Sequence, residues 1–508
     1  MGIRMSGLIS GLDTESIVGA LMSAQSLKKT KMTNAKTKLE WKQTKWKDLN
    51  SKLYKLYTGS VSKMRLSSTF NAKKAAVANA DVASVSANSS AVNGSYNMTV
   101  KQIATSQYVT SGKVESLTDA GQKLSSVDAS LVGKKVYVNG DTENPIEITE
   151  DMSVTQFTKT LAAKGINASY DTTQQRFFLS SKSSGEESAF TLTSDDGALA
   201  KLGLSEITRD AEGKIDVSGA VYDEETKSYK DSATGMTIIK AQDSEVVLNG
   251  AMLTSASATL VANGLSISLT STGSTSFTVA TDVDGIYDSI KAALKEYNDV
   301  LAEMNTLYSA ESAKDYEPLT SEQKKAMSDD EVEEWENKIK SALLRNDTTL
   351  DGIREAMKSA MQSSVSYNGQ SYTLGSLGIM TSTNWQEGGL YHIYGDSEDS
   401  TYADQADKLK AAIASDPQLV SDVLSGIFEN LRTNMYNKMG TTELSSALTF
   451  YNDKQMDTQL KNYQTEISDY ETKLEDLEDT YYKKFSALES AMAKMQSQQS
   501  SLSSLIGG

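Results

Sequence analysis

The sequence predicts an α+β protein of several domains, in which long helices at the two chain ends pair antiparallel as a coiled coil and nested antiparallel β-rich domains lie between them. Three observations predict this class. Apolar side chains recur at every seventh position near both ends, the two runs carry opposite charge, and short alternating strands fill the middle of the chain.

The C-terminal run indicates one very long helix. No Pro or Gly interrupts residues 453–506, so at 1.5 Å rise per residue the helix would be about 80 Å long. A helix of that length needs a partner to bury its apolar stripe. The predicted C-terminal seam residues are Leu460, Tyr463, Ile467, Tyr470, Leu474, Leu477, Tyr481, Phe485 and Leu488.

The predicted partner is the N-terminal run, where the same spacing returns. Residues 28–55 carry ten Lys against two acids, and residues 466–489 carry eight acids against three Lys. Because flanking charges select partner and orientation in coiled coils, we expect the two ends to pair lengthwise. Two solvated amphipathic helices with unrelated partners are the alternative. The predicted N-terminal seam residues are Met32, Leu39, Trp46, Leu49, Leu53 and Leu56.

Composition excludes several function classes. A net charge of −17 and a pI near 4.8 argue against a nucleic-acid partner. With no Cys and only His392, the chain offers no disulfide, thiolate or multi-histidine metal site, and no Walker loop, dinucleotide fingerprint or nucleophile elbow is present. We therefore predict no catalytic residue, no cofactor, no metal and no membrane partner, and we interpret His392 as structural.

The extreme ends differ in composition from the rest of the helices. Residues 1–27 contain only three charged side chains and residues 490–508 only one. Such segments make marginal helices alone, so we predict that they become ordered on contact with another molecule; frayed ends are the alternative. The predicted contact residues are Leu8, Leu12, Ile17, Leu21, Met495, Leu502 and Leu505.

The sequence predicts β-hairpins in the middle of the chain. Asn249-Gly250 and Asn263-Gly264 each lie between apolar runs, a strong signal for a tight hairpin turn. A small α+β unit is predicted as an insertion, within which the polar segment 206–233 is expected to be a long surface loop. The predicted domains are 1–40 with 465–508, 41–70 with 282–464, 71–114 with 237–281, and 115–236.

The ends also resemble a known family. The run Ser6-Gly7-Leu8-Ile9-Ser10-Gly11-Leu12-Asp13-Thr14-Glu15-Ser16-Ile17-Val18 resembles the N-terminal signature of the flagellar filament cap family, flagellar hook-associated protein 2. Residues 93–104, 343–347, 377–379 and 481–499 are similar to further segments of that family, in the same order, and residues 136–192 resemble a small repeat of flagellins and their caps.

The resemblance implies a non-enzymatic protein at the distal tip of the bacterial flagellum, outside the cell, that helps exported flagellin fold and insert and prevents its loss. It implies export by the flagellar type III route without a cleaved signal peptide. Implied partners are further copies in a closed ring, expected as a pentamer, with flagellin, hook–filament junction proteins and a cytoplasmic export chaperone. In this reading the helices form a leg, the ends contact the filament and the β-rich domains form a head. A junction or filament subunit, a secreted adhesin for mucin or other glycans, and a carbohydrate-active enzyme remain alternatives.

Overall fold

The structure, a computed structural model, describes residue 11 and residues 13–506. The chain divides into two compact units. Unit 1 combines Met1–Phe70 with Val283–Gly508, and unit 2 is Asn71–Asp282. Both ends of the chain thus belong to the same unit, and the middle forms the other.

Unit 1 is a bundle of helices with two small hairpins. Its long helices are α1 (Thr14–Leu56), α6 (Val283–Tyr308), α11 (Pro417–Lys438) and α12 (Asp453–Ile506). Its shorter helices are α2 (Ser62–Met64), α3 (Ser67–Phe70), α7 (Ser321–Lys325), α8 (Asp329–Ser341), α9 (Thr348–Met361) and α10 (Lys408–Ser415). Its strands are β18 (Val365–Tyr367), β19 (Gln370–Tyr372), β20 (Ile379–Thr381) and β21 (Tyr391–Ile393).

Local sequence signals set where these helices begin. The Asp13 carboxylate accepts a hydrogen bond from the Ser16 backbone N–H at 3.0 Å and caps α1. Capping boxes at Thr320 and Ser328 open α7 and α8. Asp416 caps α11, whose first residue is Pro417, where a missing N–H costs nothing. Each of these four helices thus begins after a residue whose side chain satisfies backbone N–H groups of the first turn.

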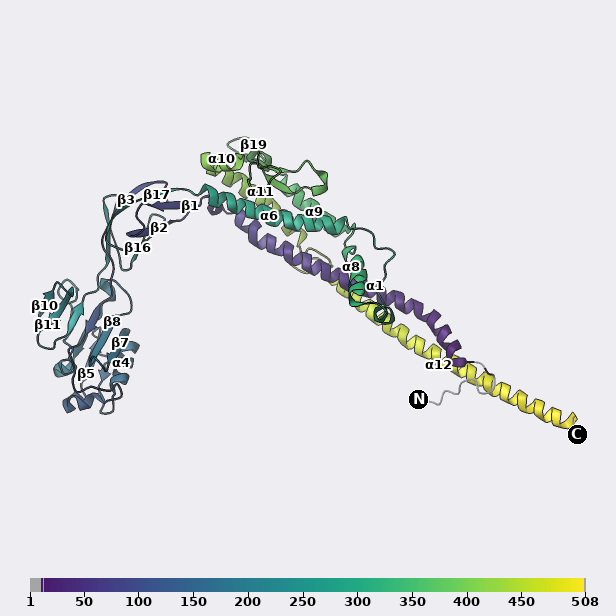
Figure 1. Ribbon diagram of the computed structural model, residues 1–508, viewed down its shortest axis with the longest axis horizontal. Helices are drawn as coiled ribbons and strands as arrows, with labels where there is room; N and C mark the ends of the chain where they lie inside the picture. Colours follow the sequence, from purple (N-terminus) through teal and green to yellow (C-terminus); the bar gives the residue numbers. More distant parts are fainter. Residues whose placement is uncertain (1–10, 12, 507–508) are drawn as a thin grey trace. The chain divides into compact units, whose positions relative to one another are not determined.

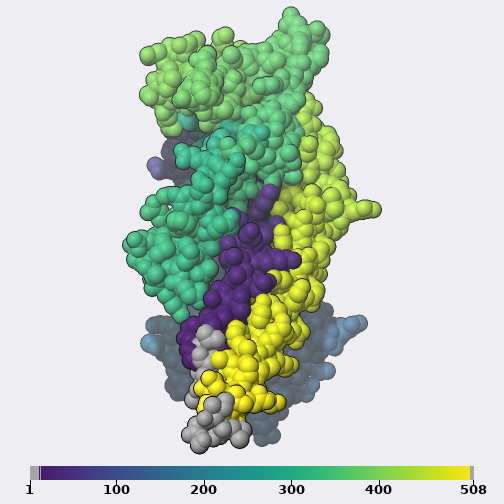
Figure 2. Space-filling view, turned by 90° about the vertical axis from the view of Figure 1, so that its right-hand side faces the viewer, coloured from purple at the N-terminus to yellow at the C-terminus, as the bar shows by residue number. Residues whose placement is uncertain are grey.

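The core of unit 1 is formed by the second half of α1 with α6, α9 and α11. Figure 1 shows α6 running alongside that half of α1, and an ion pair of 2.6 Å between Lys52 and Glu303 joins the two helices. Figure 2 shows α1 (purple) lying between α12 (yellow) and the teal and green segments of this unit. Fully buried members of this core include Leu49, Leu53, Leu56, Ile290, Leu301, Leu350, Met357, Val423, Leu424 and Ile427.

Unit 2 is built from antiparallel sheets. A five-stranded sheet in the order β1-β17-β3-β13-β14 packs on a three-stranded sheet β15-β16-β2, with Met98, Val246 and Phe277 in the shared core. The strands are β1 (Lys73–Val77), β2 (Ala83–Ala87), β3 (Gly94–Gln102), β13 (Ser244–Leu248), β14 (Ala251–Ser255), β15 (Thr259–Ala262), β16 (Leu265–Leu269) and β17 (Gly273–Thr281). Asn249 and Asn263 have positive φ, so both predicted Asn-Gly turns are confirmed.

A second body of unit 2 holds a six-stranded sheet in the order β10-β11-β12-β4-β8-β7, a three-stranded sheet β6-β5-β9, and α4 (Val154–Ala163). Their shared core runs from Val109 to Ala241. The strands are β4 (Tyr108–Thr110), β5 (Lys135–Val138), β6 (Ile146–Glu147), β7 (Ile166–Asp171), β8 (Arg176–Ser181), β9 (Leu192–Ser194), β10 (Ala220–Asp223), β11 (Ser228–Asp231) and β12 (Thr237–Ile239); a short helix α5 (Ala198–Lys201) follows β9.

Two sequence expectations are wrong in this body. The stretch 206–233 is not a surface loop throughout, because β10 and β11 form a hairpin in which Tyr222 pairs with Tyr229. The domain boundaries expected at 114/115 and 236/237 lie inside this body, since β4 pairs with both β8 and β12. Strand membership depends on non-local pairing, which local composition does not encode.

The mixed fold class, with helices and antiparallel sheets, is confirmed by these elements. Within the described residues, no helix is both long and apolar enough to cross a lipid bilayer.

Candidate functional site

The two terminal helices α1 and α12 lie side by side and run antiparallel (Figure 1). Near one end the Trp46 and Tyr451 rings stack, with centroids 5.6 Å apart. The Gln43 side-chain amide donates to Asp457 at 2.6 Å. Further along, Lys29 forms an ion pair of 2.7 Å with Glu471.

Since the residue numbers rise on α12 as they fall on α1, this register places the start of α1 opposite residues near 481–486. α12 therefore continues beyond the first residue of α1. The Tyr470 hydroxyl donates to the Gln25 carbonyl at 3.2 Å. Of the α12 residues in these contacts with α1, Tyr470 and Glu471 lie nearest the C-terminus.

The predicted seam residues fall into three groups. Trp46, Leu49, Leu53, Leu56 and Ile467 are buried. Leu488 is 43% exposed. The half-buried members are Met32, Leu39, Leu460, Tyr463, Tyr470, Leu474, Leu477, Tyr481 and Phe485.

Four of the seam assignments need correction. The backbone N–H of Phe450 bonds to the Asn50 side chain at 2.8 Å, and Phe450 precedes the first residue of α12. Leu53 and Leu56 lie past this point and Leu49 beside it, so these three are buried in the helical bundle rather than against α12. Leu488 lies beyond the start of α1 and is exposed for that reason.

The prediction that the lysines of α1 pair with the acids of α12 is wrong for most of these lysines. Four lysines of α1 reach acids outside α12: Lys38 binds Glu317 at 2.8 Å, Lys42 binds Asp347 at 2.7 Å, Lys52 binds Glu303 at 2.6 Å and Lys55 approaches Glu296 at 3.8 Å. Among the described residues, only the ion pair of Lys29 with Glu471 joins the two charged runs. The antiparallel register explains this, because it places residues 36–55 before the acidic run begins.

Three of the four predicted contact residues whose side chains the structure describes are exposed. Leu21 is 39% exposed, Met495 60% and Leu502 61%, whereas Ile17 is half-buried. Leu8, Leu12 and the side chain of Leu505 lie outside what the structure describes. The final part of α12 thus presents apolar side chains that nothing described in this chain covers.

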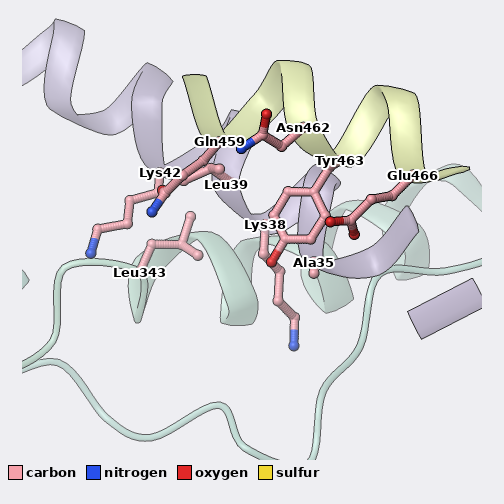
Figure 3. Close-up of a pocket in the computed structure, with 9 residues that line it drawn as sticks. All are labelled: Ala35, Lys38, Leu39, Lys42, Leu343, Gln459, Asn462, Tyr463 and Glu466. Carbon is pink, nitrogen blue, oxygen red and sulfur yellow. The ribbon is translucent and has the colours of Figure 1, made fainter. Parts of the chain in front are cut away.

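A groove of about 510 Å³ opens between α1, α12 and the segment that follows α8 (Figure 3). Leu39, Leu343 and Tyr463 supply its apolar surface, and Lys38, Lys42 and Glu466 its charges. Figure 3 shows the Tyr463 ring between the two helices and the Lys38 and Lys42 ammonium groups extending outward. The groove is open to solvent rather than enclosed.

The single histidine belongs to a clamp that the sequence analysis did not foresee. His392 Nδ1 lies 2.7 Å from the Asp399 carboxylate and Nε2 lies 2.9 Å from that of Glu387. Its ring also contacts Tyr402, with centroids 4.7 Å apart. His392 is therefore the centre of a loop anchor, and the concentration of acids around the only histidine was the available signal. Within the described residues, no group of His, Cys, Asp and Glu is arranged to hold a metal ion.

Comparison with known proteins supplies the family. Residues 10–107 match the family described as flagellar hook-associated protein 2 N-terminus, and residues 241–497 match flagellar hook-associated protein 2 C-terminus. A flagellar hook-associated protein 2 of Halalkalibacterium halodurans is 26% identical over 482 residues, covering 88% of this chain and 83% of the relative. One of Thermotoga maritima is 29% identical over 194 residues, covering 35% of this chain and 31% of the relative.

A solved structure shares the fold. The D1-D2-D3 domains of the flagellar cap protein FliD from Escherichia coli superpose with a TM-score of 0.52 at 18% identity, covering 78% of this chain and 97% of that chain. The resemblance seen in the terminal motifs is thus confirmed by matches that together include both chain ends and the strands nearest them. This chain belongs to the flagellar hook-associated protein 2 family.

Proposed function

We propose that this chain is a structural cap at the distal end of the bacterial flagellar filament, where it promotes the folding and insertion of exported flagellin subunits and prevents their loss. The main support for this proposal is that the two family models match the N-terminal and C-terminal parts of the chain. The E. coli protein of similar fold is described as a flagellar cap protein, which supports the same role. Neither a junction or filament subunit nor an adhesin for mucin or other glycans is favoured by any of these relatives.

In this proposal the pair α1 and α12 is a coiled-coil leg that reaches toward the filament. Residues 1–40 with 465–508 form the terminal helical segment, and residues 41–70 with 282–464 form the rest of the leg. The exposure of Met495 and Leu502 supports contact with flagellin at this end. Residues 71–281 form the nested β-rich head.

The proposed partners follow from the same role. Copies of the chain form a closed ring, for which we propose a pentamer, and the ring contacts flagellin and, during assembly, hook–filament junction proteins. Before export by the flagellar type III system, without a cleaved signal peptide, a cytoplasmic chaperone binds the chain. The role is structural and requires no catalytic residue, cofactor or metal.

The test is complementation of a strain that lacks its own copy of this gene. A triple variant with Leu488→Ser, Met495→Ser and Leu502→Ser removes the uncovered apolar side chains of α12. We expect unpolymerised flagellin in the medium, short filaments and loss of motility, because the leg no longer holds the filament end.

Leu444→Ser is the matched control, since Leu444 is 46% exposed in the same unit but precedes α12. Normal filaments from the triple variant would contradict the proposed contact. Normal filaments from the strain with no cap gene at all would contradict the proposed function.

A further inference from the structure

We propose that His392 is a pH-dependent latch: its doubly protonated ring holds residues 382–390, which join β20 to β21, and loss of one proton releases them. This device lies inside unit 1 and goes beyond the proposed function. It does not depend on what the chain caps, so either can fail without the other.

The ring of His392 lies between two carboxylates. Its Nδ1 is 2.7 Å from Asp399 Oδ2, and its Nε2 is 2.9 Å from Glu387 Oε2. A neutral imidazole carries one N–H group, whereas an imidazolium carries two. Only the charged ring can donate to both carboxylates at once, so the clamp is complete only while His392 holds its second proton.

The position of the ring is fixed by its surroundings. His392 is the central residue of β21 and pairs with Met380 of β20. Its ring contacts that of Tyr402, with centroids 4.7 Å apart, and the Tyr402 ring stacks in turn on Tyr394. The His392 side chain is only 20% exposed. Loss of a proton should therefore change the hydrogen bonds of the ring rather than its place.

Of the two bonds, the one to Asp399 is the better supported. It is the shorter, and the Asp399 carboxylate also accepts a hydrogen bond from the Thr401 backbone N–H at 3.1 Å. The Asp399 carbonyl accepts from the Tyr402 N–H at 2.9 Å, which fixes the turn. The Glu387 carboxylate has no second hydrogen-bond partner among the described residues. We therefore expect a neutral His392 to keep Nδ1–H on Asp399 and to give up the bond from Nε2.

Without its proton, Nε2 faces Glu387 as a second acceptor. A ring lone pair and a carboxylate oxygen 2.9 Å apart repel each other, and both lose the hydrogen bond that offset their partial burial. The Glu387 side chain is 32% exposed, so water is within its reach. Its carboxylate should therefore turn outward into solvent, and the latch opens.

Little else holds the segment that Glu387 anchors. Among the described residues, one further side-chain hydrogen bond ties residues 384–388 to the rest of the unit: Asn305 of α6 donates to the Gly388 carbonyl at 3.3 Å. Trp385 is 84% exposed and adds little burial. Because segments with few buried contacts open at low free-energy cost, loss of the Glu387 bond should loosen residues 384–388 while the helices stay folded.

The other charges that face the ring come from α6 and from the turn after β21. A cavity of about 540 Å³ is lined by His392 together with Asp288, Lys291, Lys295, Asp396, Glu398 and Asp399. Lys291 pairs with Asp396 and Glu398. Lys295 pairs with Asp299, and β20 has no ionisable side chain. Both ammonium groups are thus balanced by acids, and no unpaired cation described at this cavity opposes a positive charge on the ring.

The direction of the pH effect follows from these contacts. Histidine is the side chain whose charge ordinarily changes between about pH 5 and 8, and Asp and Glu as a class stay ionised through that range. The latch is closed at the acid end, where the ring carries two protons, and opens as the pH rises. Because the closed form binds one more proton than the open form, the pH sets the ratio of the two.

The first test reads the protonation of the ring directly. His392 is the only histidine of the chain, so the full-length protein, made without a histidine tag and with isotope-labelled histidine, gives a single imidazole in nitrogen NMR spectra. We expect both ring nitrogens to be protonated at about pH 5 and Nδ1 alone at about pH 8. A ring that keeps both protons throughout, or that keeps Nε2–H and loses Nδ1–H, would overturn the proposal.

The second test follows the segment itself. The natural chain has no cysteine to compete for a spin label, so Gln386→Cys places the label at an exposed position beside Glu387. We expect a mobile spectral component that grows as the pH rises, with the midpoint of the His392 titration. Thr441→Cys is the matched control, since Thr441 is exposed in a loop of the same unit, and its label should not respond. A Gln386→Cys label that stays unchanged while His392 titrates contradicts the latch.

A third measurement removes the pH dependence but keeps the latch. In the Gln386→Cys chain, Glu387→Gln replaces the carboxylate by an amide that can accept from Nε2–H or donate to bare Nε2. We expect this label to stay immobile over the whole range. Glu387→Ala offers neither group, and its label should be mobile at both ends. A Glu387→Gln chain that still loosens with rising pH, or a Glu387→Ala chain that stays immobile at acid pH, would show that Glu387 is not the latch.

The capping function is tested apart from the latch. A chain whose latch behaves as expected but that fails to restore filaments contradicts only the capping function. A chain that restores filaments but whose label ignores the pH contradicts only the latch.

Discussion

The indole of Trp46 stacks on the ring of Tyr451, with centroids 5.6 Å apart and ring planes inclined by only 7°. The two residues are separated by most of the chain, so this contact ties the N-terminal helix to the segment that leads into α12. Trp46 is 1% exposed, and stacked aromatic pairs contribute beyond the burial of their area.

Replacing this residue is expected to destabilise unit 1 strongly. Trp46→Ala should lower the free energy of unfolding by about 3–5 kcal/mol, as for other buried aromatic side chains. Trp41→Ala is the matched control, because Trp41 is only half-buried and its ring faces the Lys340 ammonium at 4.7 Å; its loss should be clearly smaller. Urea unfolding followed by circular dichroism measures both, and equal losses would contradict the assigned packing.

The lysines of α1 should not be equivalent. Lys42→Glu places a second negative charge beside Asp347, the residue that caps α9 and whose side chain is 10% exposed. We expect a loss of about 1–3 kcal/mol that decreases partly with added salt. Lys45→Glu, with no ion pair among the described residues, should change stability by no more than about 0.5 kcal/mol. Equal effects of the two reversals on the unfolding midpoint would show that Lys42 does not depend on Asp347.

The buried hydroxyl of Tyr297 has no hydrogen-bond partner among the described residues. Tyr297 of α6 is 0% exposed, and its hydroxyl is unsatisfied. Tyr297→Phe should therefore raise the stability of unit 1 by about 1 kcal/mol, because the cost of burying the hydroxyl is removed. Tyr367→Phe is the comparison, since the Tyr367 hydroxyl lies 3.3 Å from the Asp416 carboxylate and its removal should be neutral or slightly destabilising. A clear decrease in thermal stability for Tyr297→Phe would mean that the hydroxyl is satisfied after all.

Unit 1 should lose stability in alkaline solution. Burial raises the pKa of Tyr391 to about 12, and burial together with nearby acids raises the pKa of Tyr287 to about 12. A raised pKa in the folded state favours the neutral phenol, so this contribution is complete below the ordinary tyrosine pKa of about 10 and is lost as the pH rises toward 12. Unfolding midpoints measured from neutral pH to pH 12, with Tyr391→Phe as the variant, test this prediction. The variant should lose less stability over that range than the wild type, and an identical pH dependence would contradict it.

The seam shows where sequence reasoning reached its limit in this protein. Leu49 and Leu53 are predicted to lie against the C-terminal helix, but they are buried where α1 runs alongside α6, beyond the first residue of α12. A seven-residue period reveals that a helix has an apolar stripe, but not which helix covers each part of it. Lys42 is a similar case, because its charge indicates that an acid lies nearby but not that the acid is Asp347.

The sequence by itself determined what depends on neighbours along the chain. The long terminal helices, the caps at Asp13, Thr320, Ser328 and Asp416, and the Asn249 and Asn263 turns all follow from local periodicity and backbone preference. The terminal motifs also indicated the family. Only the tertiary structure decided the register of α1 against α12, the sheet that holds β4 and β12, and the clamp around His392. These features join residues far apart in the sequence, and their free energy depends on packing and charge in three dimensions.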